Sequence, residues 1–102
     1  MQTLRAGIAI PAYNCEKQII RAIAALAQLP NLKEKVQHVW IIDNRSPDGT
    51  VEKSLRAIKE NHVENWISVV RNSENYGLGG SHKVGFQLME ENKLDWMLLF
   101  LL

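Results

Sequence analysis

Three short polar loops contain the residues of this chain whose types suit ligand binding. Tyr13, in the first loop, offers a flat ring to a nucleobase, and Asp43, at the start of the second, can accept hydrogen bonds from a sugar hydroxyl or a base N–H. The third loop, residues 75–80, is rich in glycine, so its backbone can approach a ligand closely. Each loop follows an apolar run and precedes a helical pattern, and such loops gather at the carboxyl edge of a parallel sheet. The sequence therefore predicts one small-molecule site built from distant loops.

Each loop also has a purely structural interpretation. Asp43 suits the first position of an Asx turn. Because residues 44–50 are of types that form turns, this structural role is as well supported by the sequence as ligand binding is. Tyr13 is also typical of an aromatic residue that packs over a helix start. Asn75 and the glycines suit a tight turn and a helix cap, although free N–H groups at a helix start can receive an anion. The spacing from the glycines to Lys83 matches neither a P-loop nor a dinucleotide fingerprint.

The residues predict binding rather than catalysis within this chain. His38, His62 and His82 converge on no common face and have no partners at metal-ligand spacing, so no metal site is predicted and His82 is expected to face solvent. Cys15 begins a predicted helix without a base beside it, and no serine lies in a G-x-S-x-G elbow. No catalytic residue is therefore predicted.

Alternating strands and helices position the three loops. Strands are predicted from four apolar runs, at residues 6–10, 39–42, 66–70 and 94–102. Because the connections are long enough for helical crossovers, the predicted fold class is α/β, a Rossmann-like parallel sheet of about four strands with helices on both faces. We expect the strand order 3-2-1-4, with Pro11, Asp43 and Gly79 in one crevice at the carboxyl edge.

Helical spacing of apolar residues predicts a helix after each of the three loops. The first helix is expected to be capped by Asn14, and the second by Ser46 or Asp48. The apolar residues expected to face inward are Ile19, Ile20, Ile23, Leu26, Ala27, Val51, Leu55, Ile58, Val84, Phe86, Leu88 and Met89.

Length and composition exclude several classes of function. The chain has 102 residues, one predicted domain, and a net charge of +1 without a basic cluster, so neither nucleic acid nor an anionic membrane is an expected partner. The apolar run 96–102 is shorter than the roughly 20 residues of a membrane span, so no transmembrane segment is predicted. A single cysteine and the lack of a secretion signal favour the cytoplasm. The final strand is apolar, so both of its faces must be buried and its edge must be paired. This favours a homodimer.

Taken together, the loops resemble the amino-terminal half of family 2 glycosyltransferases with the GT-A fold. Residues 8–14 are similar to the opening strand and loop of that family, and residues 41–50 to its second-strand acidic motif. Residues 75–80, with Gly85-Phe86 after them, are similar to its third segment, especially in the polyprenyl-phosphate sugar transferase branch. The resemblance implies that residues 1–102 are the nucleotide-sugar-binding half of a GT-A domain.

The resemblance also assigns binding roles to particular residues. In such enzymes the first loop and the aspartate hold the nucleoside of a nucleotide diphosphate sugar, and the glycine segment borders the same pocket. The positions implied here are Pro11, Ala12, Tyr13, Asp43, Gly79 and Gly80. The family commonly has a second acidic residue or a glycine where this chain has Asn44. The resemblance therefore does not assign a second carboxylate contact with the donor to this loop.

The resemblance further implies a divalent metal, Mg²⁺ or Mn²⁺, for the full-length enzyme. The Asp-x-Asp-like motif that holds this metal lies just after the fourth strand in the family, whereas this chain ends at Leu102. We therefore expect the metal ligands and the catalytic base to lie outside the chain, and the fragment itself to transfer no sugar. Two alternatives stay open, a non-catalytic α/β interaction module and the donor half of a nucleotidyltransferase. Membrane association of the full-length protein also stays open.

Overall fold

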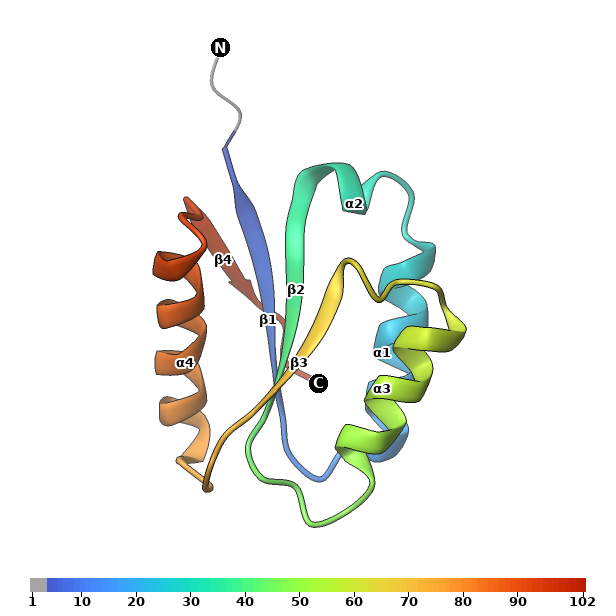
Figure 1. The fold of residues 1–102 in the computed structure, drawn as a ribbon, viewed down its shortest axis with the longest axis vertical. Coiled ribbons are helices and arrows are strands. Elements are labelled where there is room, and N and C mark those ends of the chain that lie inside the picture. Colours follow the sequence, from blue (N-terminus) through green and yellow to red (C-terminus); the bar gives the residue numbers. More distant parts are fainter. Residues whose placement is uncertain (1–3) are drawn as a thin grey trace.

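The computed structural model describes residues 4–102 and shows a parallel four-stranded sheet between two helical layers (Figure 1). The elements in chain order are β1 Ala6–Ala12, α1 Glu16–Gln28, α2 Leu32–Lys35, β2 Val36–Asp43, α3 Thr50–Glu60, β3 Ile67–Arg71, α4 Gly77–Glu91 and β4 Trp96–Leu99. The strand order is β3-β2-β1-β4, and every pairing is parallel. The predicted fold class and strand order are confirmed, and the short helix α2 occupies a link that the sequence analysis left without structure.

The two central strands are buried on both faces. Helices α1 and α3 cover one face and α4 covers the other (Figure 1). On β2, Ile41 belongs to the core beneath α1 and α3, whereas its neighbour Ile42 packs in the core beneath α4. Consecutive apolar residues on a strand are typical of a sheet covered on both sides. This arrangement leaves the carboxyl ends of the strands as the open edge where loops can form a site.

Three apolar side chains that were expected to face inward are exposed instead: Ile20, Leu55 and Phe86. The buried residues of α1 are Ile19, Ile23 and Leu26, and this stripe is too narrow to include Ile20. On α3 the buried face is made of Thr50, Ser54, Ala57 and Ile58, so small and polar side chains take the place expected for Leu55. The predictions were wrong because apolar spacing alone does not define the width of the contacting face.

Helices α1 and α3, which correspond to the first two predicted helices, also begin differently from the prediction. Asn14 adopts a left-handed backbone conformation, with φ 53°, and the N-cap of α1 is Cys15, which makes no side-chain cap. The N-cap of α3 is Gly49, one residue after Asp48, whose carboxylate still accepts a hydrogen bond from the N–H of Thr50 at 3.0 Å. Asn14 is thus not the cap, whereas Asp48 serves the helix start from just outside it.

Strand β4 is shorter than the predicted run 94–102, although Phe100 extends its pairing through a hydrogen bond from its N–H to Ala9 O at 2.9 Å. The side chains of Trp96, Leu98 and Leu99 are exposed on this edge strand. A homodimer formed through this edge stays a prediction. Among the helices of residues 4–102, none has the length and apolar character needed to cross a bilayer.

Candidate functional site

A cavity of about 330 Å³ lies at the carboxyl edge of the sheet, where the three predicted loops meet. Its lining residues come from the end of β1, the end of β2, the loop after β3 and the first turn of α4: Pro11, Ala12, Tyr13, Asn44, Asn75, Gly77, Leu78 and Ser81. Among residues 4–102, no charged side chain lines it. The structure therefore brings Pro11, Ala12 and Tyr13 together with parts of the other two loops, in a neutral pocket.

Tyr13 separates this cavity from a second one. The neighbouring cavity, of about 360 Å³, is also lined by Pro11, Tyr13 and Leu78, and it extends towards Gln18. The side chain of Tyr13 is 50% exposed, so it does not pack over the start of α1 as a buried aromatic residue would. An exposed aromatic ring between two adjoining cavities is available to stack on a planar ligand.

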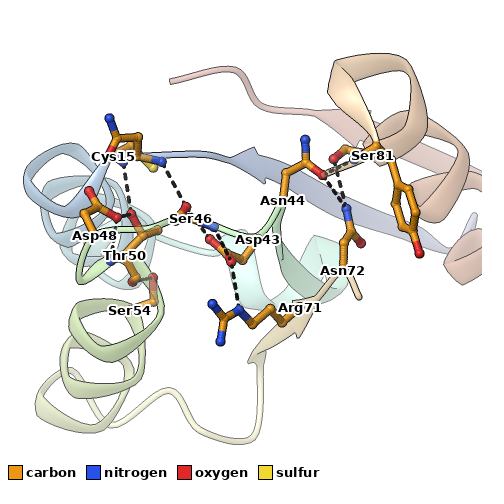
Figure 2. A network of polar contacts seen from close by, with 12 residues as sticks. Cys15, Asp43, Asn44, Ser46, Asp48, Thr50, Ser54, Arg71, Asn72 and Ser81 are labelled. Carbon is orange, nitrogen blue, oxygen red and sulfur yellow. Dashed lines mark hydrogen bonds and ion pairs between the residues drawn. The ribbon is translucent and has the colours of Figure 1, made fainter. Parts of the chain in front are cut away.

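Asp43 lies beneath the loop rather than in the cavity wall. Its side chain is 0% exposed, and both of its oxygens are used within the protein. Oδ1 accepts a hydrogen bond from the Ser46 hydroxyl at 2.6 Å, and Oδ2 accepts one from the Ser46 N–H at 3.1 Å. Arg71, which is about half exposed, adds an ion pair to Oδ2 at 3.5 Å (Figure 2). The Asx-turn alternative thus describes the observed contacts of Asp43, and its role in binding a nucleotide stays a prediction.

Asn44 joins the second loop to the third. Its Oδ1 accepts hydrogen bonds from the N–H of Tyr76 at 2.8 Å and from Nδ2 of Asn72 at 3.0 Å. Its Nδ2 donates to Oδ1 of Asn75 at 2.8 Å. Its backbone N–H donates to Ala12 O at 2.9 Å, so the first loop is connected as well. A carboxylate at this position could accept but could not donate to Asn75, which explains physically why an amide stands here.

Asn72 extends this connection to helix α4. Its N–H donates to Asp43 O at 2.8 Å, and its Nδ2 donates to Asn44 and, at 3.4 Å, to Oγ of Ser81 (Figure 2). Ser81 is buried and lines the cavity. Sequence reasoning did not assign a site role to Asn44, Asn72, Asn75 or Ser81. The signal that could have found two of them is their position, since Asn44 and Asn72 each follow directly after a strand at its carboxyl end.

Gly79 and Gly80 lie in a different hollow from the one predicted. They line a space of about 650 Å³ with Tyr76, Lys83 and Gln87, whereas Gly77 and Leu78 line the cavity beside Pro11. Helix α4 already begins at Gly77, and each helical residue is rotated by about 100° from the last, so successive glycines point to different sides. The expectation of one crevice for Pro11, Asp43 and Gly79 is therefore corrected.

Gly80 is required by packing at the helix start. A Cβ atom at this position would collide with the side chain of Tyr76, so only glycine lets that ring lie against the first turn. Gly77 has φ +74°, a left-handed conformation that favours glycine. His82, expected to face solvent, is instead partly buried, and its Nε2 has no hydrogen-bond partner among residues 4–102.

The first two loops are fixed to each other by reciprocal hydrogen bonds. Asn14 N–H donates to Ser46 Oγ at 2.9 Å, and Cys15 N–H donates to Thr50 Oγ1 at 3.0 Å (Figure 2). In return, Gly49 N–H donates to Glu16 Oε2 at 3.0 Å. These bonds satisfy N–H groups at the starts of α1 and α3 that have no partner within their own helices. The cavity wall at the end of β1 is consequently held by the second loop.

Ionisation in this region follows from the same contacts. Burial alone would raise the pKa of Asp48, but hydrogen bonds from the hydroxyl and N–H of Thr50 and from the N–H of Glu16 bring that pKa below its ordinary value. Burial raises the pKa of the Cys15 thiol, with smaller opposing effects from its hydrogen bonds. Cys15 is thus held as a neutral thiol near neutral pH and is a poor nucleophile.

The carboxylates near the cavity do not fit a divalent metal. Within the part of the chain that the structure describes, no three His, Cys, Asp or Glu side chains gather at metal-binding distance. The oxygens of Asp43, Asp48 and Glu16 already accept hydrogen bonds from loop and helix-start donors. Mg²⁺ and Mn²⁺ need several free oxygen ligands, so no chemical step through a metal is derived from these residues.

Comparison with known proteins places the chain in context. A sequence profile described as "Glycosyl transferase family 2" matches residues 7–99. A solved structure, the mannosyltransferase PcManGT from Pyrobaculum calidifontis in complex with GDP-Man and Mn²⁺, is similar with a TM-score of 0.69 and 21% sequence identity. The match covers 86% of this chain and 25% of PcManGT, so the chain spans about a quarter of that protein's length, and the likeness is one of fold. No sequence among curated proteins matches the chain significantly.

Proposed function

This chain belongs to glycosyl transferase family 2, and on that basis we propose that residues 1–102 form the nucleotide-sugar-binding half of a GT-A glycosyltransferase domain. The observation that carries the proposal is the neutral cavity of about 330 Å³ at the carboxyl edge of the sheet. Ligands of open α/β sheets bind at this edge, and pockets for small molecules begin at about 300 Å³. In this proposal the whole enzyme transfers a sugar from a nucleotide diphosphate to an acceptor.

The cavity suits the nucleoside part of the donor. Tyr13 supplies a ring for stacking, while Pro11 and Ala12 form the wall at the end of β1. Asn44 and Ser81 supply polar groups at the opposite wall. Because no charged side chain lines the cavity, it suits an uncharged base and ribose better than a diphosphate.

The remaining predicted residues have secondary places in the proposal. Asp43 acts as a positioning residue, since it holds Ser46, which in turn accepts a hydrogen bond from the first loop. Gly79 and Gly80 border the neighbouring hollow, where Lys83 adds a positive charge beside them. This hollow is the candidate place for a more distant, negatively charged part of the donor.

A divalent metal and a diphosphate sugar donor are proposed for the whole enzyme only. PcManGT, which shares the fold, was solved with GDP-Man and Mn²⁺, and this supports both classes of ligand. The polyprenyl-phosphate branch and a cytoplasmic location stay predictions. An interaction module without a nucleotide site is the competing function, and the experiment below separates the two.

The direct test is a titration of the isotopically labelled 102-residue chain with UDP and with GDP, followed through amide NMR signals. We expect shifts at Tyr13, Asn44 and Ser81, with Tyr13→Ala weakening the affinity about tenfold, the low end of the roughly 1–3 kcal/mol that a base stacked on an aromatic ring contributes. Phe86→Ala, which removes another exposed aromatic ring far along α4, is the matched control and should bind normally. Absence of cavity shifts with either nucleotide at millimolar concentration would favour the interaction module. Mg²⁺ or Mn²⁺ should not tighten binding to this chain.

A further inference from the structure

A separate cavity of about 280 Å³ lies at the amino edge of the sheet. Its lining residues come from the residue before β1, the first half of β2 and the link from α4 to β4: Arg5, Gln37, His38, Trp40, Asn92 and Leu94. The starts of β1 and β2 lie at the top of Figure 1, whereas the three loops of the candidate site lie at the bottom. The proposed function makes no use of this cavity.

Trp40 presents an unpaired hydrogen-bond donor at this cavity. The residue is only 7% exposed, and its Nε1–H has no acceptor among residues 4–102. Nε1 nevertheless keeps some accessible surface, unlike Nε2 of His82, which is enclosed without a partner. Because Trp40 lines the cavity, we assign the opening at its indole N–H to this hollow. A tryptophan N–H that is this buried usually has a partner, so a ligand that supplies an acceptor is favoured here.

Arg5 adds a positive charge that has no counter-ion. Its guanidinium forms no ion pair within residues 4–102, and Asp95 instead accepts the backbone N–H of Arg5 at 2.7 Å. One guanidinium nitrogen donates to Oε1 of Gln37 at 3.5 Å, which leaves several N–H groups available. His38 also lines the cavity, but burial lowers the pKa of its imidazole. Arg5 therefore supplies the charge of the lining at neutral pH.

Gln37 contributes further donors. A guanidinium cannot accept a hydrogen bond, so the amide oxygen of Gln37 faces Arg5, and its Nε2 keeps two hydrogens that have no acceptor among residues 4–102. Asn92 provides the complementary group, since its Nδ2 donates to Leu88 O at 2.8 Å and its Oδ1 remains as an acceptor. The lining thus combines one cation and several neutral donors with a single amide oxygen.

We infer that this cavity binds a small oxyanion, the phosphate or carboxylate group of a small molecule, between the guanidinium of Arg5 and the indole N–H of Trp40. Oxygens of these groups accept several hydrogen bonds at once, and those from a guanidinium are among the strongest in proteins. Oδ1 of Asn92 can also accept a hydroxyl hydrogen, which a phosphate group partly retains near neutral pH. The inference does not depend on the proposed function, because the two cavities lie at opposite edges of the sheet.

The test is a titration of the isotopically labelled 102-residue chain with sodium phosphate and, separately, with sodium acetate, at an ionic strength held constant with sodium chloride. The indole N–H signals report directly on the site. We expect the Trp40 signal to shift and saturate, whereas Trp66, whose Nε1 donates to Val36 O at 2.9 Å, should not respond. Saturation with phosphate alone or with acetate alone identifies the kind of oxyanion. Equal shifts of Trp40 and Trp66, or no shift of Trp40 with either anion, would overturn the inference.

Arg5→Gln tests the charged group. The variant keeps a polar side chain but removes the guanidinium, so the affinity for the anion that saturates the wild type should fall about tenfold or more. Arg21→Gln removes the same charge from the exposed surface of α1 and is the matched control, which should bind normally. Trp40→Phe keeps an aromatic ring and removes only the indole N–H, and it should weaken binding severalfold when followed through the amide signal of Gln37. Equal affinities of Arg5→Gln and Arg21→Gln would contradict the site.

Discussion

The side-chain oxygen of Asn44 lies 2.8 Å from the backbone nitrogen of Tyr76, so a single amide fixes the end of β2 to the N-terminus of α4. Tyr76 is the N-cap of that helix and makes no side-chain cap of its own. Asn44 therefore acts as a cap supplied from 32 residues away in the sequence. The cavity wall formed by the first turn of α4 depends on this contact.

Asn44→Asp should destabilise the protein by about 2–3 kcal/mol at neutral pH, because a carboxylate oxygen would face Oδ1 of Asn75 where an N–H now donates. Asn75 cannot turn its amide to compensate without losing the hydrogen bond from Gly77. Urea unfolding followed by circular dichroism measures the loss. Asn65→Asp, at an exposed position, is the matched control and should have the stability of the wild type within about 0.5 kcal/mol. Equal unfolding of the two variants would contradict the proposed role of Asn44.

Asp43→Asn should reduce both stability and nucleotide affinity. Both oxygens of Asp43 accept hydrogen bonds or an ion pair, and an amide in their place removes the negative charge that strengthens the bonds from Ser46 and the ion pair with Arg71. We expect a loss of about 2 kcal/mol in the free energy of unfolding. Glu52→Gln, which breaks an exposed ion pair with Arg56 on α3, should cost less than about 0.5 kcal/mol. Weaker nucleotide binding without loss of stability would instead indicate that Asp43 contacts the ligand directly.

The fold could be predicted because its signals are local. Strand β2 contains consecutive apolar residues from Val39 to Ile42, and such runs between helical patterns predict buried parallel strands. The sheet order then follows from the handedness of the crossovers. The narrow buried faces of α1 and α3 could not be predicted, because the contact between two helices decides which flanking residue, such as Ile20 or Leu55, is covered.

The sequence predicts which loops form the candidate site, but it does not predict which side-chain atoms contact one another there. Pro11, Ala12 and Tyr13 line the cavity, as the crowding of loops at the carboxyl edge indicated. The amide contacts of Asn44 could not be predicted, since its partners lie 28 to 32 residues away. Gly79 was misplaced because the start of α4 at Gly77 decides which residues of the first turn face the cavity.

Gly85→Ala should stabilise the protein, although this glycine is buried between α4 and the sheet. An added Cβ would lie 3.5 Å from Cβ of Ala9 and 3.8 Å from Cδ1 of Ile42, which are ordinary contact distances. Replacing a glycine inside a helix with alanine contributes about 0.5–1 kcal/mol. Thermal unfolding should therefore show a midpoint raised by several degrees, since about 1 kcal/mol corresponds to roughly 4–8 °C in a domain of this size.

Gly7→Ala is the contrasting variant. A Cβ on this residue of β1 would lie 2.7 Å from Cδ1 of Leu94 and 2.9 Å from Cζ3 of Trp40, so these core side chains would have to move. Overpacking of this kind costs about 1–3 kcal/mol. If Gly85→Ala and Gly7→Ala changed the unfolding midpoint in the same direction, the difference in packing between the two glycines would be wrong.

His38 should make the protein less stable as pH falls below about 6.5, the ordinary pKa of an unfolded-state histidine. Burial lowers the pKa of its imidazole, which lies 2.7 Å from Ser68 Oγ and packs against Trp40. The unfolded chain binds this proton more readily, so the contribution of neutral His38 is fully present above about pH 6.5 and is lost as pH falls through the lower folded-state pKa. Asp48, whose pKa is also lowered, acts in the same direction but at pH values below about 4.

Urea unfolding at intervals between pH 5 and 7.5 measures this dependence, which His38→Asn should flatten. The exposed His62 is the control. Its backbone is left-handed, with φ 56°, a conformation that asparagine adopts readily, so His62→Asn should keep the pH slope of the wild type. Parallel pH profiles for the wild type and His38→Asn would show that another group titrates in this range.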